Sequence, residues 1–244
     1  MKRNTTIALF YTGVAVICVG IVSTAMWLGK GLNAPYQAPV VVNTGKDTVQ
    51  SWFPITKDLS ATNQDNKAVK LSDLRGKVWL VAEFFAVCPN CAVRNGQELR
   101  AIYDEFKSQP DFHIACVSID PESDNVERLE DYSKALGADS KNWWFLNAGD
   151  AKTTHEYLEQ TLKFIKVQNR IDPLDIETNG KYSHDMAFTL VDRDFNVIGK
   201  WDLVGLKSES GEKLAPGFYQ KYKAELFDRI RAELAARVAP TPAA

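Results

Sequence analysis

The chain has 244 residues and a formal net charge of −2, so it lacks the strong positive charge that a nucleic-acid partner requires. Its composition is that of an ordinary globular protein, which excludes a low-complexity chain. Without its two ends, about 190 residues are left, enough for one well-packed domain.

The N-terminal segment predicts a membrane anchor over residues 1–30. Ile7 to Leu28 contains no charged residue, and a helix of that length spans about 33 Å, enough to cross the hydrocarbon core. Lys2 and Arg3 precede it, so the positive-inside rule places the N-terminus in the cytoplasm. A cleaved signal peptide ending near Ser23-Thr24-Ala25 is the alternative, although its apolar region is normally only about 7–15 residues long. Either way, the rest of the chain is expected outside the cytoplasm, on the periplasmic side of a cell membrane.

Beyond the anchor, the sequence predicts three regions. Residues 31–50 are polar and irregular, which indicates a linker. Residues 51–238 form the expected domain, and residues 239–244 form an expected disordered tail.

Within the expected domain, apolar runs alternate with helical periodicity. The predicted strands are a central one from Val78 and four others over Phe112 to Ile119, Trp143 to Leu146, Ala187 to Val191 and Val197 to Leu203. The predicted helices run from Arg94 to Lys107, from near Ser123 to a cap at Gly137, from Ala151 to about Phe164 and from Pro216 to about Val238. A long loop is predicted from Val167 to Tyr182. This order predicts an α/β sandwich with a central mixed sheet.

Two cysteines follow the central strand and precede its helix. They are Cys88 and Cys91, separated by Pro89 and Asn90. Cysteines at this spacing on a first helical turn lie about 5–6 Å apart on one face, which suits a disulfide. The helix N-terminus favours the thiolate over the thiol. The pattern predicts a reactive dithiol. A structural disulfide or half of a zinc site is the alternative, although zinc would require a second ligand pair.

The other two cysteines are expected to be inert. Cys18 lies inside the apolar N-terminal segment, and Cys116 lies in the apolar run that predicts the second strand.

Several stretches resemble a known family. Lys70 to Lys77, followed by an apolar strand and a Cys-Pro turn, looks like the thioredoxin-fold group. Val117 to Glu122, which reads Val-Ser-Ile-Asp-Pro-Glu, narrows the resemblance, as does His184, eight residues before Asp192. Together these features resemble the SCO/SenC family of membrane-anchored copper-handling proteins.

The resemblance covers roughly Trp52 to Leu203. It implies a thioredoxin-like sandwich that binds one copper ion through Cys88, Cys91 and His184, and a role in assembling the copper centre of cytochrome c oxidase. The expected partner is therefore an oxidase subunit or another copper or thiol protein. Thiolates select Cu(I), and imidazole also suits Cu(II). The family usually has three residues between its cysteines, whereas this chain has two.

That shorter spacing is typical of thiol–disulfide oxidoreductases, so catalysis by Cys88 and Cys91 stays a second hypothesis. Redox members of the thioredoxin fold resemble one another in having a cis-proline that faces the cysteines, just before the late hairpin. This chain has no proline between Pro173 and Pro216, and His184 lies in that region, which favours metal binding. A third hypothesis is an adaptor domain with a permanent disulfide, for which a reduction potential below about −300 mV is expected.

Two further residues have open interpretations. Glu83 interrupts the apolar central strand, and it is either a buried carboxylate near the cysteines or a solvent-facing residue at a sheet edge. Met186 is either a soft metal ligand or, the interpretation the pattern favours, a packing residue.

The remaining polar candidates are expected to be structural. Asp120 and Glu122 flank Pro121 and are interpreted as capping residues at a helix start. His113 and His155 have no partners in the pattern, so they are expected to be structural or exposed.

Overall fold

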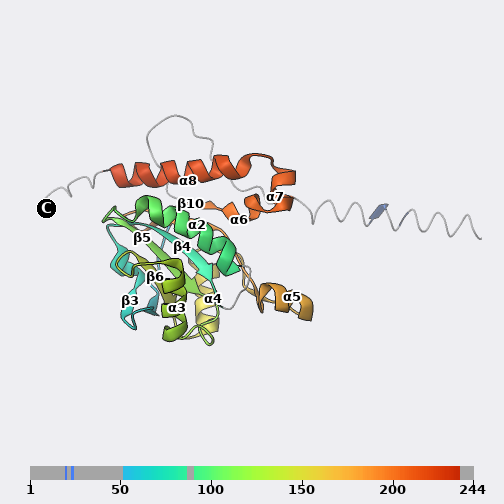
Figure 1. The fold of residues 1–244 in the computed structure, drawn as a ribbon, viewed down its shortest axis with the longest axis horizontal. Helices are drawn as coiled ribbons and strands as arrows, with labels where there is room; N and C mark the ends of the chain where they lie inside the picture. Colours follow the sequence, from blue (N-terminus) through green and yellow to red (C-terminus); the bar gives the residue numbers. More distant parts are fainter. Residues whose placement is uncertain (1–19, 21–22, 25–51, 87–90, 237–244) are drawn as a thin grey trace, which may run out of the picture. The chain divides into compact units, whose positions relative to one another are not determined.

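A mixed eight-stranded sheet forms the centre of the fold (Figure 1). The strand order is β1-β10-β9-β4-β5-β6-β2-β3. β4, β5 and β6 run parallel, and β9 pairs antiparallel with β4. The strands are β1 (Phe53–Pro54), β2 (Ser60–Asn63), β3 (Ala68–Lys70), β4 (Val78–Phe84), β5 (Phe112–Ser118), β6 (Trp143–Asn147), β9 (Phe188–Val191) and β10 (Asn196–Trp201), with β7 (Gln168–Asn169) and β8 (Tyr182–Ser183) in a separate two-stranded sheet.

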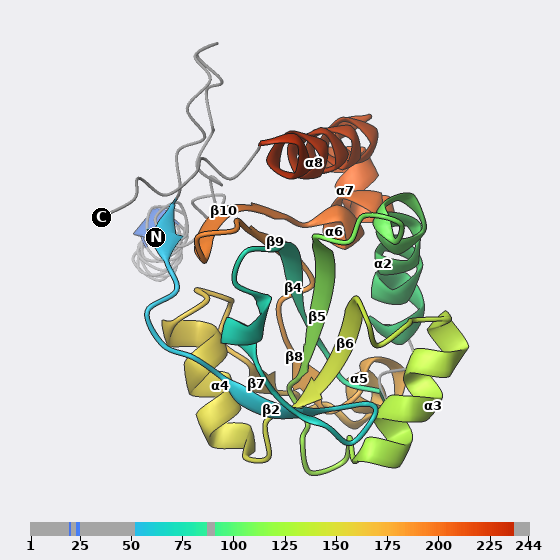
Figure 2. The same ribbon diagram turned by 90° about the vertical axis from the view of Figure 1, so that its left-hand side faces the viewer.

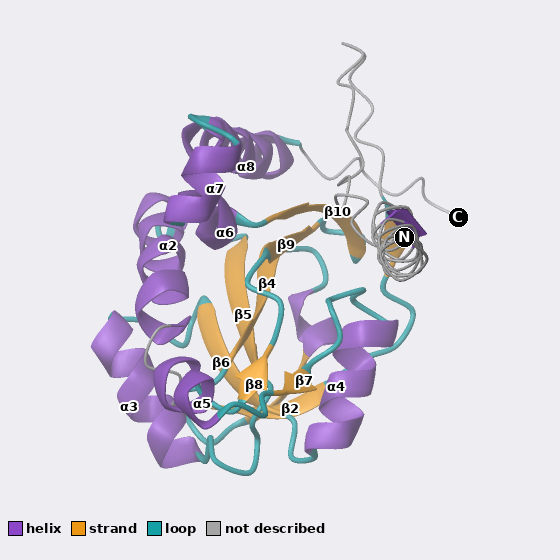
Figure 3. Cartoon of the chain, turned by 90° about the vertical axis from the view of Figure 1, so that its right-hand side faces the viewer, coloured by secondary structure: helices purple, strands orange, loops and turns teal. Residues whose placement is uncertain are grey.

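Helices cover both faces of the large sheet. Figure 2 shows α2, α3 and α8 on one side of it and α4 on the other, and Figure 3 shows the same layers from the opposite direction. The helices are η1 (Leu71–Leu74), α2 (Cys91–Phe106), α3 (Val126–Leu136), α4 (Ala151–Gln160), α5 (Pro173–Asn179), α6 (Leu203–Lys207), α7 (Glu209–Leu214) and α8 (Phe218–Ala235). This arrangement confirms the predicted α/β sandwich with a central mixed sheet.

The computed structural model describes residues 20, 23–24, 52–86 and 91–236. The two long ranges belong to one unit, Val49–Ala244. The predicted tail and nearly all of the predicted anchor and linker lie outside the described residues. Within the described part, none of the helices combines the length and the apolar character needed to span a bilayer.

Side-chain alternation along β4 and β5 divides the core into two layers. Both strands are buried at every position. Successive side chains of a strand point to opposite faces, so Val78 and Leu80 pack under α2 and α8, whereas Trp79 and Val81 pack against α4. The sequence predicts burial of β4 on both faces from its nearly continuous apolar run, and the structure confirms it.

The predicted long loop over 167–182 is wrong, because this segment contains β7, α5 and β8. Asp172 caps α5 by accepting N–H bonds from Leu174 and Asp175, and Pro173 occupies the first turn, where its missing N–H costs nothing. The helix has no apolar periodicity toward the core, since Leu174 is 72% exposed. A pattern search for buried helical faces therefore misses it.

Other element boundaries also differ from the prediction. The helix expected to start near Ser123 starts at Val126, with Asn125 as its N-cap, and Gly137 forms the predicted left-handed C-cap. The helix expected to reach Phe164 ends at Gln160. The short elements β2, α6 and α7 were not predicted.

A buried carboxylate ties the first helix after the dithiol segment to the C-terminal helices. Glu98 of α2 is 2% exposed. Its two oxygens accept bonds from Lys207 at 2.7 Å, Lys223 at 3.0 Å and the Tyr219 hydroxyl at 2.9 Å. Charge-assisted bonds of this kind are stronger than neutral ones, so they hold α2 against α6 and α8.

His113 is a buried histidine of β5. Its ring packs edge-on against Trp144 at 4.4 Å between centroids, and neither ring nitrogen has a hydrogen-bond partner within the described ranges. Burial, together with nearby Lys77, lowers the pKa of His113 well below its ordinary value. The unfolded chain therefore takes up a proton below about pH 6.5 that the folded chain does not. Stability is expected to fall there by up to about 1.4 kcal/mol per pH unit.

We expect His113→Leu to raise the free energy of unfolding by about 1 kcal/mol at pH 7, because the substitution removes unpaired buried nitrogens at similar volume. It should also flatten the decline of stability at mildly acidic pH. Urea unfolding followed by circular dichroism at pH 7 and at pH 5 measures both effects. An acid slope equal to that of the wild type would contradict the assignment.

Candidate functional site

The predicted dithiol lies at the junction of β4 and α2. β4 ends at Phe84 and α2 begins at Cys91, so the predicted strand and the predicted helix start at Cys91 are confirmed. Cys88 and the side chain of Cys91 lie outside the described part of the structure. Their assignment as catalytic and metal-binding residues stays a prediction.

Asp124 fixes the end of β4 just before the dithiol. Both of its oxygens lie 3.2 Å from the Ala86 amide nitrogen, which donates to them, and one oxygen accepts the Ser118 hydroxyl at 2.6 Å. Burial raises the pKa of Asp124, and these two hydrogen bonds oppose the rise. The carboxylate therefore joins the end of β5 to the residues that follow β4.

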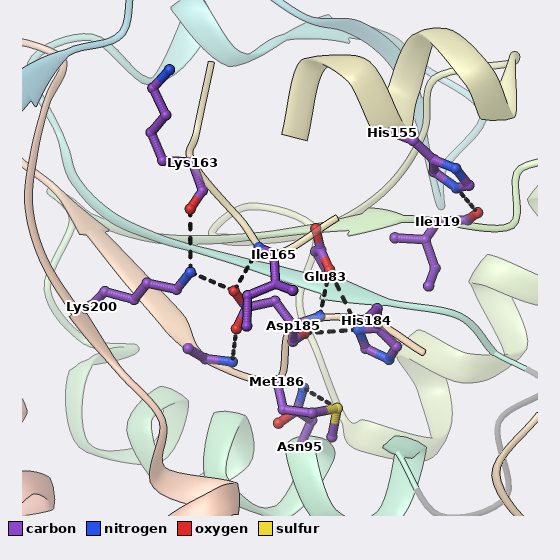
Figure 4. A network of polar contacts seen from close by, with 11 residues as sticks. Glu83, Asn95, Ile119, His155, Lys163, Ile165, His184, Asp185, Met186 and Lys200 are labelled. Carbon is purple, nitrogen blue, oxygen red and sulfur yellow. Dashed lines mark hydrogen bonds and ion pairs between the residues drawn. The ribbon is translucent and has the colours of Figure 1, made fainter. Parts of the chain in front are cut away.

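Glu83 is the buried carboxylate that one of the two sequence interpretations described. Its side chain has no exposed area. Its Oε2 accepts the Asp185 amide N–H at 3.0 Å and lies 3.5 Å from the His184 Nδ1 (Figure 4). Burial raises the pKa of Glu83, although His184 acts in the opposite direction. The carboxylate links β4 directly to the segment that carries the late histidine.

The orientation of His184 follows from the acceptor beside its ring. The side chain is fully buried, and its ring packs edge-on against Phe85 at 5.5 Å between centroids. Nδ1 lies 2.8 Å from the Asp185 carbonyl oxygen, which can only accept, so Nδ1 carries the proton. In the neutral ring, Nε2 then presents a lone pair, and this buried atom has no hydrogen-bond partner among the described residues.

Asp185 anchors the segment from the other side. Its carboxylate accepts the Ile165 and Ala187 amide N–H groups, each at 3.0 Å, and forms an ion pair with Lys200 of β10 (Figure 4). It is 4% exposed. Asp185 therefore ties the segment of the neighbouring His184 to two other parts of the chain, the residues before β7 and strand β10.

Asp120 does not cap a helix, so that prediction is wrong. Its side chain is buried and forms an ion pair with Lys181 at 2.8 Å, next to β8. Asn125 caps α3 instead because it is the residue directly before the first helical turn. Asp120 therefore ties the end of β5 to the segment that leads into His184.

The other candidates from the sequence behave as structural residues. His155 places Nε2 2.7 Å from the Ile119 carbonyl oxygen. Cys116 is fully buried, and this burial raises its pKa to about 12, so its predicted inertness is consistent with the structure.

A cavity of about 320 Å³ lies beside His184. Its lining includes Met186 from the same segment, Arg94 from α2 and Arg170 from the α5 region.

Sequence reasoning missed Asp185, which holds the His184 segment, and Asn95, which contacts it. Asp185 had one available signal, a carboxylate directly after the histidine and three residues before the start of β9.

The chemistry of these groups fits copper. Neutral imidazole with its other nitrogen donating to a carbonyl is the usual state of a metal-bound histidine. In His184, Nδ1 already contacts the Asp185 carbonyl oxygen, and the buried Nε2 has no partner among the described residues. Two cysteine thiolates would supply the soft ligands that Cu(I) prefers.

Comparison with known proteins gives consistent results. A family model described as SCO1/SenC matches residues 48–215, more than half of the chain. The SCO1 protein homolog of Bacillus subtilis (strain 168) is 26% identical over 137 residues, which cover 56% of this chain and 67% of the relative.

Solved structures share the fold at low identity. BsSco, described as a member of the Sco family of cytochrome c oxidase assembly proteins with a disulfide switch, has a TM-score of 0.59 at 21% identity and covers 79% of this chain and 98% of its own. Arabidopsis thaliana ScoI with copper bound has a TM-score of 0.52 at 18% identity and covers 72% and 98%. The fold is thus a mixed α/β, thioredoxin-like one. From the extent of the family match, we conclude that the chain belongs to the SCO1/SenC family.

Proposed function

We propose that this protein binds one copper ion through Cys88, Cys91 and His184. The observation that supports the proposal most directly is the buried Nε2 of His184, which presents a lone pair and lacks a partner within the described residues. An unpaired buried polar atom costs free energy, and a bound metal ion would remove that cost.

The surrounding residues prepare His184 for this role. The Asp185 carbonyl fixes the tautomer, and Glu83 sits close enough to the same nitrogen to stabilise a ring that carries partial positive charge. Phe85 limits rotation of the ring from one side. Copper is the cargo of this site, and the protein's own contribution is to present the imidazole in one orientation.

We further propose a role in delivering copper to the cytochrome c oxidase copper centre, or in maintaining its thiols. Membership in the SCO1/SenC family supports this role, as do the description of BsSco as an oxidase assembly protein and the copper found in Arabidopsis ScoI. The proposed partner is an oxidase subunit or another copper or thiol protein.

The organisation of the chain in the cell is also part of the proposal. Residues 1–30 would anchor the protein in the cell membrane with the N-terminus in the cytoplasm, and residues 31–50 would link the anchor to the domain at 51–238. The uncharged run from Ile7 to Leu28 supports an anchor of this kind.

We expect His184→Ala to weaken copper binding by about 10- to 100-fold, because the variant loses the preoriented imidazole. A copper titration of the full-length protein in detergent, under reducing conditions, measures the change. His155→Gln is the matched control, because this histidine contacts the Ile119 carbonyl rather than the site, and glutamine retains a donor. Equal affinities of His184→Ala and the wild type would rule out the histidine's role.

Thiol–disulfide exchange is the second candidate function. The two-residue spacing of Cys88 and Cys91, with Cys91 at the first position of α2, favours it. If the wild type fails to bind copper in the same titration but reduces a disulfide substrate with a dependence on both cysteines, this second function replaces the first.

A further inference from the structure

Met186 lies two residues after His184 and is outside the packed core. Neither of the two hydrophobic clusters that fill the described faces of the sheet contains it, although Ala187 and Phe188 beside it are buried. It is half-buried and lines the same cavity as His184. Packing, which the sequence favours as the role of this side chain, therefore does not account for its position.

The thioether of Met186 points toward α2. Its Sδ accepts a weak bond from the Asn95 Nδ2 at 3.8 Å, and Figure 4 shows the sulfur directed at that side chain. Asn95 is 3% exposed, and its Oδ1 has no partner within the described residues. A polar side chain of α2 is thus buried beside the sulfur one helical turn after Cys91.

His184 and Met186 contact opposite flanks of the dithiol segment. The His184 ring packs on Phe85, three residues before Cys88, whereas Met186 contacts Asn95, four residues after Cys91. Asp185 between them points away, toward Lys200. The two donor side chains therefore contact the described residues that precede and follow the cysteine segment in the sequence.

We propose that Met186 Sδ is a further copper ligand, one that binds Cu(I) in preference to Cu(II). The inference rests on the proposed copper-binding function. A thioether is soft and uncharged, so it favours the monovalent ion. The N–H···S contact with Asn95 is weak, so the sulfur can exchange it for a metal bond at small cost. Asn95 is then a positioning residue, because its contact orients the sulfur before the metal binds.

The chain offers a direct spectroscopic test. Its only methionines are Met1, Met26 and Met186. Full-length selenomethionine protein loaded with Cu(I) is measured by X-ray absorption at the selenium edge. We expect a copper atom in the selenium environment of the wild type and of Met26→Leu, and its loss in Met186→Leu. The wild-type signal does not depend on the folding of any variant.

Affinity is the second readout. Competition with a Cu(I) chelator should show that Met186→Leu, a near-isosteric change, binds Cu(I) about tenfold more weakly, with the affinity for Cu(II) unchanged. Copper bound with a His184 dependence but without a selenium–copper signal would overturn only this inference. A wild type that binds no copper would overturn the proposed function and the inference together.

Discussion

Replacing Cys88 or Cys91 by serine is expected to abolish tight Cu(I) binding. A serine hydroxyl stays protonated at neutral pH and is a hard donor, so each variant loses a soft anionic ligand. Changes to residues that only support a metal ligand already cost about 10- to 100-fold in affinity, so the loss of a ligand should exceed about 100-fold. Competition with a Cu(I) chelator, using the full-length reduced protein, measures it.

Cys116→Ala provides the control for this experiment. It also removes a thiol, but that thiol is fully buried in β5 and is not one of the proposed copper ligands. Its copper affinity should match that of the wild type. Wild-type affinity in either serine variant would show that the dithiol is not the ligand pair.

Removing the carboxylate of Asp185 is expected to produce the second large effect. Asp185→Ala leaves Lys200, which is 18% exposed, without its partner and removes the acceptor of two amide N–H groups. Breaking one side of such a mostly buried ion pair should cost about 3 kcal/mol of unfolding free energy. Copper affinity should also fall by about tenfold, because His184 loses its neighbouring anchor.

Two variants separate the causes. Asp185→Asn keeps the shape and an acceptor oxygen, and it should lose less stability than Asp185→Ala. The double variant Asp185→Ala/Lys200→Met removes the unpaired charge and should recover part of the loss, because the remaining cost is then the two unpaired amides. Urea unfolding measures all of them. A change below about 0.5 kcal/mol for Asp185→Ala would place it among ordinary surface substitutions and contradict the anchoring role.

The main features of the fold could be predicted from the sequence where burial produces a regular spacing of apolar residues. The apolar run from Val78 and the helical spacing after Arg94 predict β4 and α2, because β4 is buried on both faces and α2 packs one apolar face on the sheet. α5 could not be found in this way, since its apolar side chains Leu174 and Ile176 are exposed. Local capping by Asp172 forms this helix, and a capping residue alone is a weak signal in a sequence.

The site was predictable only where a resemblance or an isolated polar residue marked it. The family motif identified His184, and the apolar context of β4 singled out Glu83 without deciding its environment. The sheet topology decides it: Glu83 pairs with Val117 of β5, and its strand β4 lies between β5 and β9, so the residue belongs to a central strand. The contact between Asn95 and Met186 joins residues 91 positions apart, and no local pattern encodes it.

The small sheet of β7 and β8, with α5 between its strands, is an excursion from the main fold. This excursion forms no strand of the large sheet, and Ile171 at its start is 93% exposed. His184, which follows it, is held by Glu83 and by the backbone next to Asp185. The exposed part around α5 can therefore change in length and surface chemistry while Glu83 and Asp185 keep the imidazole in position.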